Sequence, residues 1–282
     1  MLFHGSNTTN INHIHLKVSQ LSRSIRFYTE KLGFNVLHQT EQIAHLSTNG
    51  KDILITLEEI KNTSPLSQQK TGLYHIALLF PTRSELANCL YYLLKTKYPL
   101  QGASNHLVSE AIYLADPDGH GIELYVDRPV DTWTKKNNSI EMATYPLDVQ
   151  DLLAQKNDDP FIKLSPGTII GHIHLQVANI ADSERFYQLL GFQVVNRYGQ
   201  QAIFMSTGGY HHHIGLNTWH SEGASTSKHD EIGLKSFTIK YPNEETRKAI
   251  VDHLKKQQIK IQYQDDVFTV KDPSDNLILL SL

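Results

Sequence analysis

His13-Ile14-His15-Leu16 and His172-Ile173-His174-Leu175 are the two stretches of the sequence that decide the fold. The same two triplets follow each stretch: Arg-Phe-Tyr (26–28 and 185–187) and Leu-Gly-Phe (32–34 and 190–192). The first histidine precedes the phenylalanine of Arg-Phe-Tyr by 14 residues in both copies. So many matches at one offset indicate an internal repeat, which constrains the architecture before any other feature does.

A weaker repeat lies between and after these copies. Gly72-Leu-Tyr-His75 opens one segment and Gly233-Leu-Lys-Ser236 opens the other. Each segment closes with an Asp-Pro turn and an apolar strand. The chain therefore divides into four modules of similar length, which we number in chain order: 11–58, 72–126, 168–218 and 232–282.

Each module has the same predicted order of elements. A strand with alternating apolar positions comes first, as in Ile11–Val18. A helix with polar residues at its start follows, and Gly33 ends the first of these helices. Three short strands separated by Gly, Asn and Asp turns complete the module. The sequence thus predicts an α+β fold built from four βαβββ modules.

The stretch between the second and third modules is of a different kind. Residues 127–167 contain Pro, Asp, Lys and Asn, with a short helix expected at Leu147–Gln155. We interpret this stretch as a linker between a first domain at 1–126 and a second domain at 168–282. Each domain is expected to hold two modules.

Composition narrows the class of protein. The chain has 282 residues, a net charge of −3 and a single cysteine, Cys89. One cysteine excludes an internal disulfide, and the slight acidity argues against nucleic-acid binding. The apolar stretches are too short to span a bilayer, so no membrane association is expected. No secretion signal is recognisable at residues 1–10, so we expect a cytoplasmic protein.

Several strand residues are of metal-ligating types. Residues i and i+2 of a strand share a face, so His172 and His174 point together. His75 lies on a strand of its own, and Glu123 lies in the apolar strand Gly121–Tyr125. A buried carboxylate needs a partner or a metal. Two imidazoles with one carboxylate suit non-haem Fe(II), whereas the plainer alternatives are a hydrogen-bonded core histidine and an edge-strand glutamate in water.

The spacing leaves two candidates for the second imidazole. The fourth module has Ser236 and Leu279 where the second module has its histidine and its carboxylate. Modules three and four therefore cannot form the triad together. Pairing of modules one and two would supply His13, and pairing of modules two and three would supply His172.

Four βαβββ modules in one chain resemble the vicinal oxygen chelate superfamily. This superfamily includes glyoxalase I, extradiol ring-cleaving dioxygenases and bleomycin-resistance proteins, and two-domain catechol 2,3-dioxygenase-type proteins are the most similar. Four stretches carry the resemblance: 72–75, 109–119, 171–175 and 208–217. It implies that modules pair into two curled, incompletely closed β-sheet barrels, with a metal on a concave face.

The resemblance implies metal ligands at His75, at Glu123 and at the first histidine of a His-x-His-Leu strand. We favour His172 over His13 for the third position. The third module also carries His211-His212-His213 on its expected last strand. Extradiol enzymes have an acid–base histidine on that strand, beside a metal ligand of the same module.

Three further residues are candidates for catalysis by resemblance. His212 matches the acid–base histidine, and Tyr113 matches a tyrosine that hydrogen-bonds a substrate oxygen. His106 lies near the position of a further active-site histidine. The alternatives are a solvent-facing strand end, a cross-strand packing tyrosine and a turn histidine.

Two expectations concern the surroundings of these residues. Strand alternation would turn His211 and His213 away from the face that carries His212. The aromatic residues Phe204, Tyr210 and Trp219 are expected to line the pocket.

We therefore predict an Fe(II)-dependent extradiol dioxygenase that inserts both atoms of O2 into a catechol-like aromatic. Mn(II) is the alternative metal, because it accepts the same ligand types. The expected partners are a small aromatic substrate and O2, and the chain is compatible with a homo-oligomer. The alternative is a non-redox protein of the same fold, either a glyoxalase-like metal isomerase or a small-molecule binding or resistance protein.

Overall fold

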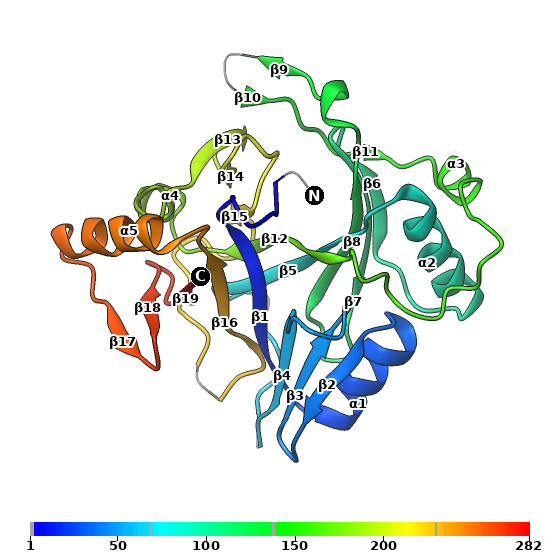
Figure 1. Ribbon diagram of the computed structural model, residues 1–282, viewed down its shortest axis with the longest axis horizontal. Coiled ribbons are helices and arrows are strands. Elements are labelled where there is room, and N and C mark those ends of the chain that lie inside the picture. Colours follow the sequence, from blue (N-terminus) through cyan, green and yellow to red (C-terminus); the bar gives the residue numbers. More distant parts are fainter. Residues whose placement is uncertain (1–2, 62, 68, 137–138, 229) are drawn as a thin grey trace.

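Two curled β-sheets form the frame of the molecule, and the helices lie on their outer sides (Figure 1). The computed structural model describes residues 3–61, 63–67, 69–136, 139–228 and 230–282. The helical segments are α1 (Leu21–Arg26), the π-helical η1 (Phe27–Lys31), α2 (Arg83–Lys95), the 3-10 helix η2 (Val130–Thr132), α3 (Val149–Leu153), α4 (Ile180–Leu189) and α5 (Glu244–Lys256). Within the described ranges, no helix is both long and apolar enough to cross a bilayer.

The second and third modules form one sheet, which we call sheet 2/3. Its strands in spatial order are β11 (Tyr145–Pro146), β6 (Gly102–Asn105), β7 (Ser109–Ala115), β8 (Gly121–Asp127), β5 (Gly72–Leu79), β12 (Ile169–Gln176), β15 (Ile214–Asn217), β14 (Ala202–Ser206) and β13 (Gln193–Tyr198). The opening strands of the two modules, β5 and β12, meet antiparallel at its centre.

The first and fourth modules form the other sheet, which we call sheet 1/4. Its strands in spatial order are β17 (Gln262–Gln264), β18 (Val267–Lys271), β19 (Leu277–Ser281), β16 (Gly233–Lys240), β1 (Asn10–Val18), β4 (Ile55–Glu59), β3 (Ile43–Ser47) and β2 (Asn35–Gln39). Again the opening strands, β1 and β16, meet antiparallel. The short strands β9 (Lys135–Lys136) and β10 (Ser139–Ile140) pair separately.

The sheets differ from the expected division of the chain. Each sheet takes one module from residues 1–126 and one from residues 168–282, so neither stretch forms a sheet of its own. The expected linker, 127–167, also contributes β11 to the edge of sheet 2/3. The physical reason is that each of the four modules has an opening strand whose edge can pair with that of another module. The sequence repeat alone does not determine which two opening strands pair.

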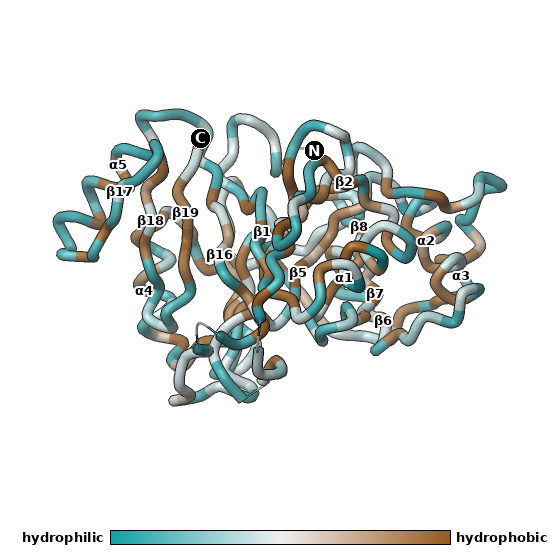
Figure 2. Tube along the Cα trace, turned by 90° about the horizontal axis from the view of Figure 1, so that it is seen from below, coloured by the Kyte–Doolittle hydropathy of each residue, from teal (hydrophilic) through white to brown (hydrophobic). Residues whose placement is uncertain are grey.

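The predicted fold class and module pattern are confirmed. The strand expected at Ile11–Val18 is β1, and the helix expected in the linker is α3. The helix of the first module changes to π-helical geometry at Phe27. The apolar residues follow the strands of both sheets (Figure 2). Most of the buried ones form one core shared by the two sheets, because β1 packs against β12.

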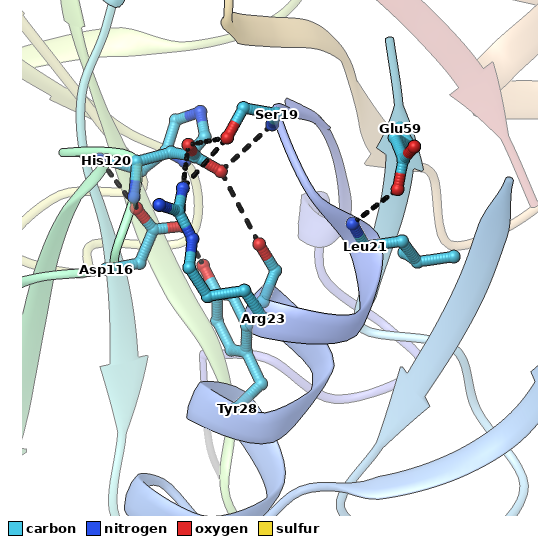
Figure 3. Close-up of polar contacts among 9 residues, drawn as sticks. Ser19, Leu21, Arg23, Tyr28, Glu59, Asp116 and His120 are labelled. Carbon is cyan, nitrogen blue, oxygen red and sulfur yellow. Dashed lines mark hydrogen bonds and ion pairs between the residues drawn. The ribbon is translucent and has the colours of Figure 1, made fainter. Parts of the chain in front are cut away.

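A turn of the second module fixes the first module in place (Figure 3). The carboxylate of Asp118 accepts hydrogen bonds from the backbone N–H of Ser19, at 3.1 Å, and from its hydroxyl, at 2.6 Å. Arg23 on α1 forms an ion pair with the same carboxylate. This Asp-Pro turn therefore stabilises the contact between the sheets.

The same turn contains a buried ion pair. Nδ1 of His120 lies 2.8 Å from a carboxylate oxygen of Asp116, which also accepts from the hydroxyl of Tyr28 at 3.3 Å. The counterpart turn of the fourth module repeats the tyrosine contact, because Tyr187 donates to Asp272 at 2.9 Å. The two turns thus hold the two Arg-Phe-Tyr helices in the same way.

Candidate active site

Strand register places three predicted site residues in one row across sheet 2/3. His172 on β12 lies opposite Ala77 on β5, which in turn lies beside Glu123 on β8. Glu123 lies opposite Tyr113 on β7. Side chains in one row share a face of the sheet. The histidine, the carboxylate and the tyrosine therefore converge, and the small side chain of Ala77 leaves room between them.

Glycines make space for the imidazoles. His75 precedes Ala77 by two residues and so shares its face, and it lies opposite Gly121. A Cβ atom on Gly121 would lie 2.3 Å from the carbonyl oxygen of Tyr74, which the backbone cannot accommodate. The register of β12 against β5 shifts at Gly171, as in a β-bulge that redirects the next side chain.

The two histidines and the glutamate form a compact cluster of potential ligands. Nε2 of His75 lies 3.0 Å from Oε2 of Glu123, and Nε2 of His172 lies 3.3 Å from the same oxygen. One ligand atom from each residue lies within 4.8 Å of the other two. Neither Nε2 atom has a hydrogen-bond partner among the described residues, although both are buried. Two imidazoles and one carboxylate left without other partners fit a divalent metal of the iron or manganese type.

The electrostatics favour the ligating form of each group. Burial alone would raise the pKa of Glu123, but His172 and His75 hold it well below its ordinary value. Burial lowers the pKa of His172 to about 4, against the opposing influence of Glu123. The carboxylate is therefore ionised and this imidazole neutral near pH 7, which is the state in which both bind metals.

The cluster lies on the wall of a cavity of about 570 Å³, to which both modules contribute. This volume is typical of small-molecule sites. The other aromatic side chains on its wall, histidines apart, are Tyr74, Tyr113, Tyr198, Phe204 and Trp219. The site is thus a pocket with several aromatic side chains on its wall and metal-ligating groups on one side.

The three residues predicted for catalysis also line this cavity. The ring of His212 lies 4.0 Å from the ring of His172, centroid to centroid. Nε2 of His106 lies 2.5 Å from the hydroxyl of Tyr113, and its Nδ1 lies 2.7 Å from the carbonyl oxygen of Ala143. The structure thus brings all six predicted site residues together, while their roles stay predictions.

Two expectations about residues 210–213 are wrong. Residues 211–213 precede β15 rather than lie in it, because the strand begins at Ile214. Strand alternation therefore does not apply, yet His212 lines the cavity and His211 and His213 do not, as expected. Nδ1 of His211 lies 2.7 Å from Nδ1 of His212. Tyr210 does not line the cavity; it is fully buried behind it, whereas Phe204 and Trp219 do line it.

The alternative ligand, His13, lies in sheet 1/4 and away from this cluster. Its Nε2 lies 2.8 Å from the hydroxyl oxygen of Thr56, and its Nδ1 lies 3.4 Å from that of Thr238. Both nitrogens thus have a hydroxyl partner, and no glutamate adjoins them. Module pairing explains the difference, because the second module pairs with the third.

Sequence reasoning missed three site features. His174 lines the cavity with its Nε2 accepting from the amide of Asn217 at 3.0 Å, and only the His-x-His spacing signalled it. Asp127, at the end of β8, contacts His211 at 2.8 Å. The cavity wall also includes residues 142–144. The last two features fall in the expected linker, whose composition gives no sign of a site.

Comparison with known proteins places this arrangement in a family. Residues 10–124 and 169–280 match the Glyoxalase/Bleomycin resistance protein/Dioxygenase superfamily. Catechol-2,3-dioxygenase of Bacillus subtilis (strain 168) is 40% identical over 269 residues, covering 94% of each chain. Metallothiol transferase FosB of Staphylococcus haemolyticus is 32% identical over 117 residues, covering 41% of this chain and 81% of that protein.

Solved structures agree on the fold. A Bacillus subtilis structure superposes with a TM-score of 0.66 at 13% identity, covering 98% of this chain and 86% of that one. Glyoxalase I from Zea mays gives 0.58 at 15% identity, covering 97% and 92%. The chain therefore belongs to the glyoxalase, bleomycin resistance protein and dioxygenase superfamily, as a homologue of a catechol-2,3-dioxygenase.

Proposed function

We propose that this chain is an Fe(II)-dependent extradiol dioxygenase that opens a catechol-like ring with both atoms of O2. The observation that carries the proposal is the cluster of His75, Glu123 and His172 on the wall of an aromatic cavity. The homologous catechol-2,3-dioxygenase supports the reaction class. Mn(II) is the alternative metal, since it accepts the same ligands.

The ligand set leaves room for substrate. Three protein ligands occupy one side of a metal and leave open positions on the other. When bound, the metal would supply the Lewis-acid and redox chemistry that lets a catechol react with O2. His75, Glu123 and His172 would hold it, and the cavity would hold the ring against it.

His212 is the proposed base. It lines the cavity beside His172, and burial, with the neighbouring histidines, lowers its pKa well below its ordinary value. A neutral imidazole can accept the proton of a substrate hydroxyl and return it later.

Tyr113 is the proposed hydrogen-bonding partner of a substrate oxygen. A carbonyl only accepts, so Nδ1 of His106 donates to Ala143 and its Nε2 accepts from the hydroxyl of Tyr113. This hydroxyl therefore donates to His106 in the structure. The phenol oxygen remains able to accept a hydrogen bond from a substrate hydroxyl.

The cavity wall favours an uncharged ring. Among the residues that the structure describes, the wall contains neither lysine nor arginine. Its partners for a substituent are aromatic faces and neutral polar groups such as Asn196 and Thr144. A carboxylate on the ring would be desolvated there with no lysine or arginine on the described wall to pair with it, which is costly.

Oxygen consumption tests this function. Protein loaded anaerobically with Fe(II) is mixed with 4-alkylcatechols, and with a catechol carrying an acidic side chain as the control. We expect oxygen uptake and a yellow ring-opened product with the neutral catechols, and much slower turnover with the acidic one. Metal binding without uptake from any catechol would contradict the dioxygenase and favour the isomerase alternative.

A further inference from the structure

A chain of polar side chains runs from His212 away from the cavity. Nδ1 of His212 lies 2.7 Å from Nδ1 of His211, and Nε2 of His211 lies 2.8 Å from Oδ1 of Asp127. The same oxygen accepts from the hydroxyl of Tyr210 at 3.1 Å. The side chain of Asp127 is 24% exposed, whereas His211 is fully buried. The chain therefore connects the proposed base to a carboxylate that reaches solvent.

Packing holds the middle ring of this chain. The ring of Tyr210 lies 4.0 Å from that of His211, and the ring of Trp133 lies 5.3 Å from it, centroid to centroid. Tyr210 is itself tied to Tyr125, hydroxyl to hydroxyl, at 2.8 Å. His211 does not line the cavity. Its hydrogen bond to the cavity wall is made to His212.

The hydrogen bonds select one tautomer of His212. A carboxylate only accepts, so Nε2 of His211 carries a proton and donates it to Asp127. In a neutral His211 the other nitrogen, Nδ1, is then an acceptor. It must accept from Nδ1 of His212, which leaves Nε2 of His212 unprotonated. This Nε2 has no hydrogen-bond partner within the described part of the chain, so it is available to a ligand.

We propose that Asp127 and His211 are positioning residues, which hold His212 in the tautomer that presents an unprotonated Nε2 to the substrate. The proposal rests on the proposed function, because it assigns partners to the base of that reaction. Carboxylate–histidine pairs set the tautomer of a working imidazole in other catalytic and metal sites. Here the carboxylate acts through one additional ring.

Nitrogen NMR tests the tautomer without turnover. Protein labelled with ¹⁵N-histidine and kept free of metal gives separate shifts for protonated and unprotonated ring nitrogens. We expect the proton of His212 on Nδ1 in the wild type. In His211→Phe, which keeps the ring packing but removes both nitrogens, we expect it on Nε2.

Steady-state kinetics of the iron-loaded enzyme complete the test. We expect Asp127→Asn and His211→Phe to lower kcat by about 100-fold or more, the usual range for loss of general base catalysis, with KM little changed. Tyr210→Phe is the matched control, since it removes a bond to the same carboxylate and leaves His211 in place. We expect it to stay close to the wild type.

The outcomes separate this inference from the proposed function. A wild-type proton on Nε2 of His212, or wild-type kcat in both His211→Phe and Asp127→Asn, would overturn the positioning role. If no catechol supports oxygen uptake, the dioxygenase proposal fails. The tautomer shift in His211→Phe would then still decide whether these residues position His212.

Discussion

Sheet 2/3 and sheet 1/4 pair their strands in the same way, but the equivalent histidines in the two sheets have different partners. His172 and His13 occupy equivalent positions, opposite Ala77 and Thr238 respectively. Burial is the largest cause that lowers the pKa of each histidine to about 4, so both imidazoles are neutral at pH 7. Protonation therefore does not distinguish them as ligands.

The neighbours make the difference. Both ring nitrogens of His13 have hydroxyl partners, on Thr56 and Thr238. Neither nitrogen of His172 has a hydrogen-bond partner among the described residues, and Glu123 lies 3.3 Å from one of them. A buried polar group without a partner is costly. The comparison indicates that His172 is left without a partner so that it can bind a ligand. In sheet 1/4, threonine hydroxyls satisfy the equivalent histidine, His13.

We expect the largest effect from removing the carboxylate of Glu123, which sets the two sheets apart. Glu123→Ala removes the carboxylate that lies between the two imidazoles, so we expect loss of metal and of oxygen uptake together. Loss of even an outer-sphere partner weakens metal binding by about 10–100-fold, and loss of a ligand should exceed that. Metal analysis after gel filtration measures the effect.

Glu58→Ala is the matched control for this change. Glu58 lies 2.8 Å from Nε2 of His15 in sheet 1/4, where it forms a similar His–Glu pair. We expect this variant to retain its metal. Equal metal loss in both variants would show that a His–Glu pair of this kind matters for folding rather than for ligation.

Exchanging the equivalent histidines should have a smaller but still clear effect. In His172→Gln we expect metal affinity to fall by more than about 10-fold, because an amide is a weaker ligand than imidazole for iron. In His13→Gln we expect unchanged affinity, since His13 binds only hydroxyls. Anaerobic Fe(II) titration compares the two. Loss of affinity in His13→Gln alone would return the third ligand to sheet 1/4.

We expect the smallest effect at the two buried Asp-Pro turns, those of the second and fourth modules, where the difference concerns how stability depends on pH. Burial would lower the pKa of His120, but the Asp116 carboxylate raises it above its ordinary value, with a smaller contribution from Asp118 and opposition from Lys17. The stability from this pair is therefore present below about pH 6.5 and is lost as pH rises through the raised pKa. The counterpart of His120 is Asn276, which does not titrate.

His120→Asn gives the turn of the second module the residue that the fourth module has at the equivalent position. We expect it to cost about 1.5–3 kcal/mol near pH 6, the range for hydrogen bonds to charged groups, and less near pH 9. Urea unfolding at both pH values gives the difference. Asn276→Ala is the control, because no histidine titrates in its turn. A cost for His120→Asn that grows with pH would contradict the assignment of the raised pKa.

Much of this architecture could be predicted from repeated residues. Arg-Phe-Tyr lies within the helical segment and Leu-Gly-Phe follows it in both copies, and His-x-His places two imidazoles on one face. Glu123 stood out because a carboxylate in an apolar strand needs a partner. These signals depend only on residues close together in the sequence, and the folded structure retains the arrangement that they predict.

Two other features depended on contacts that no local pattern encodes. Modules pair across the halves because all four opening strands present compatible edges, so the sequence alone left His13 and His172 as alternatives. The contact of His211 with Asp127 joins a loop to the end of β8 across 84 residues. Strand periodicity correctly turned His211 away from the cavity that His212 lines, but it gave no sign of their contact, because residues 211–213 precede β15, which begins only at Ile214.

Metal stoichiometry tests the central claim most directly. Protein without an affinity tag is purified anaerobically, supplied with Fe(II), and analysed for metal per chain. We predict one ion per chain in the wild type and none in Glu123→Ala, because among the described residues two imidazoles and a carboxylate converge closely enough to share an ion only in sheet 2/3. Two ions per chain, or none in the wild type, would contradict the account.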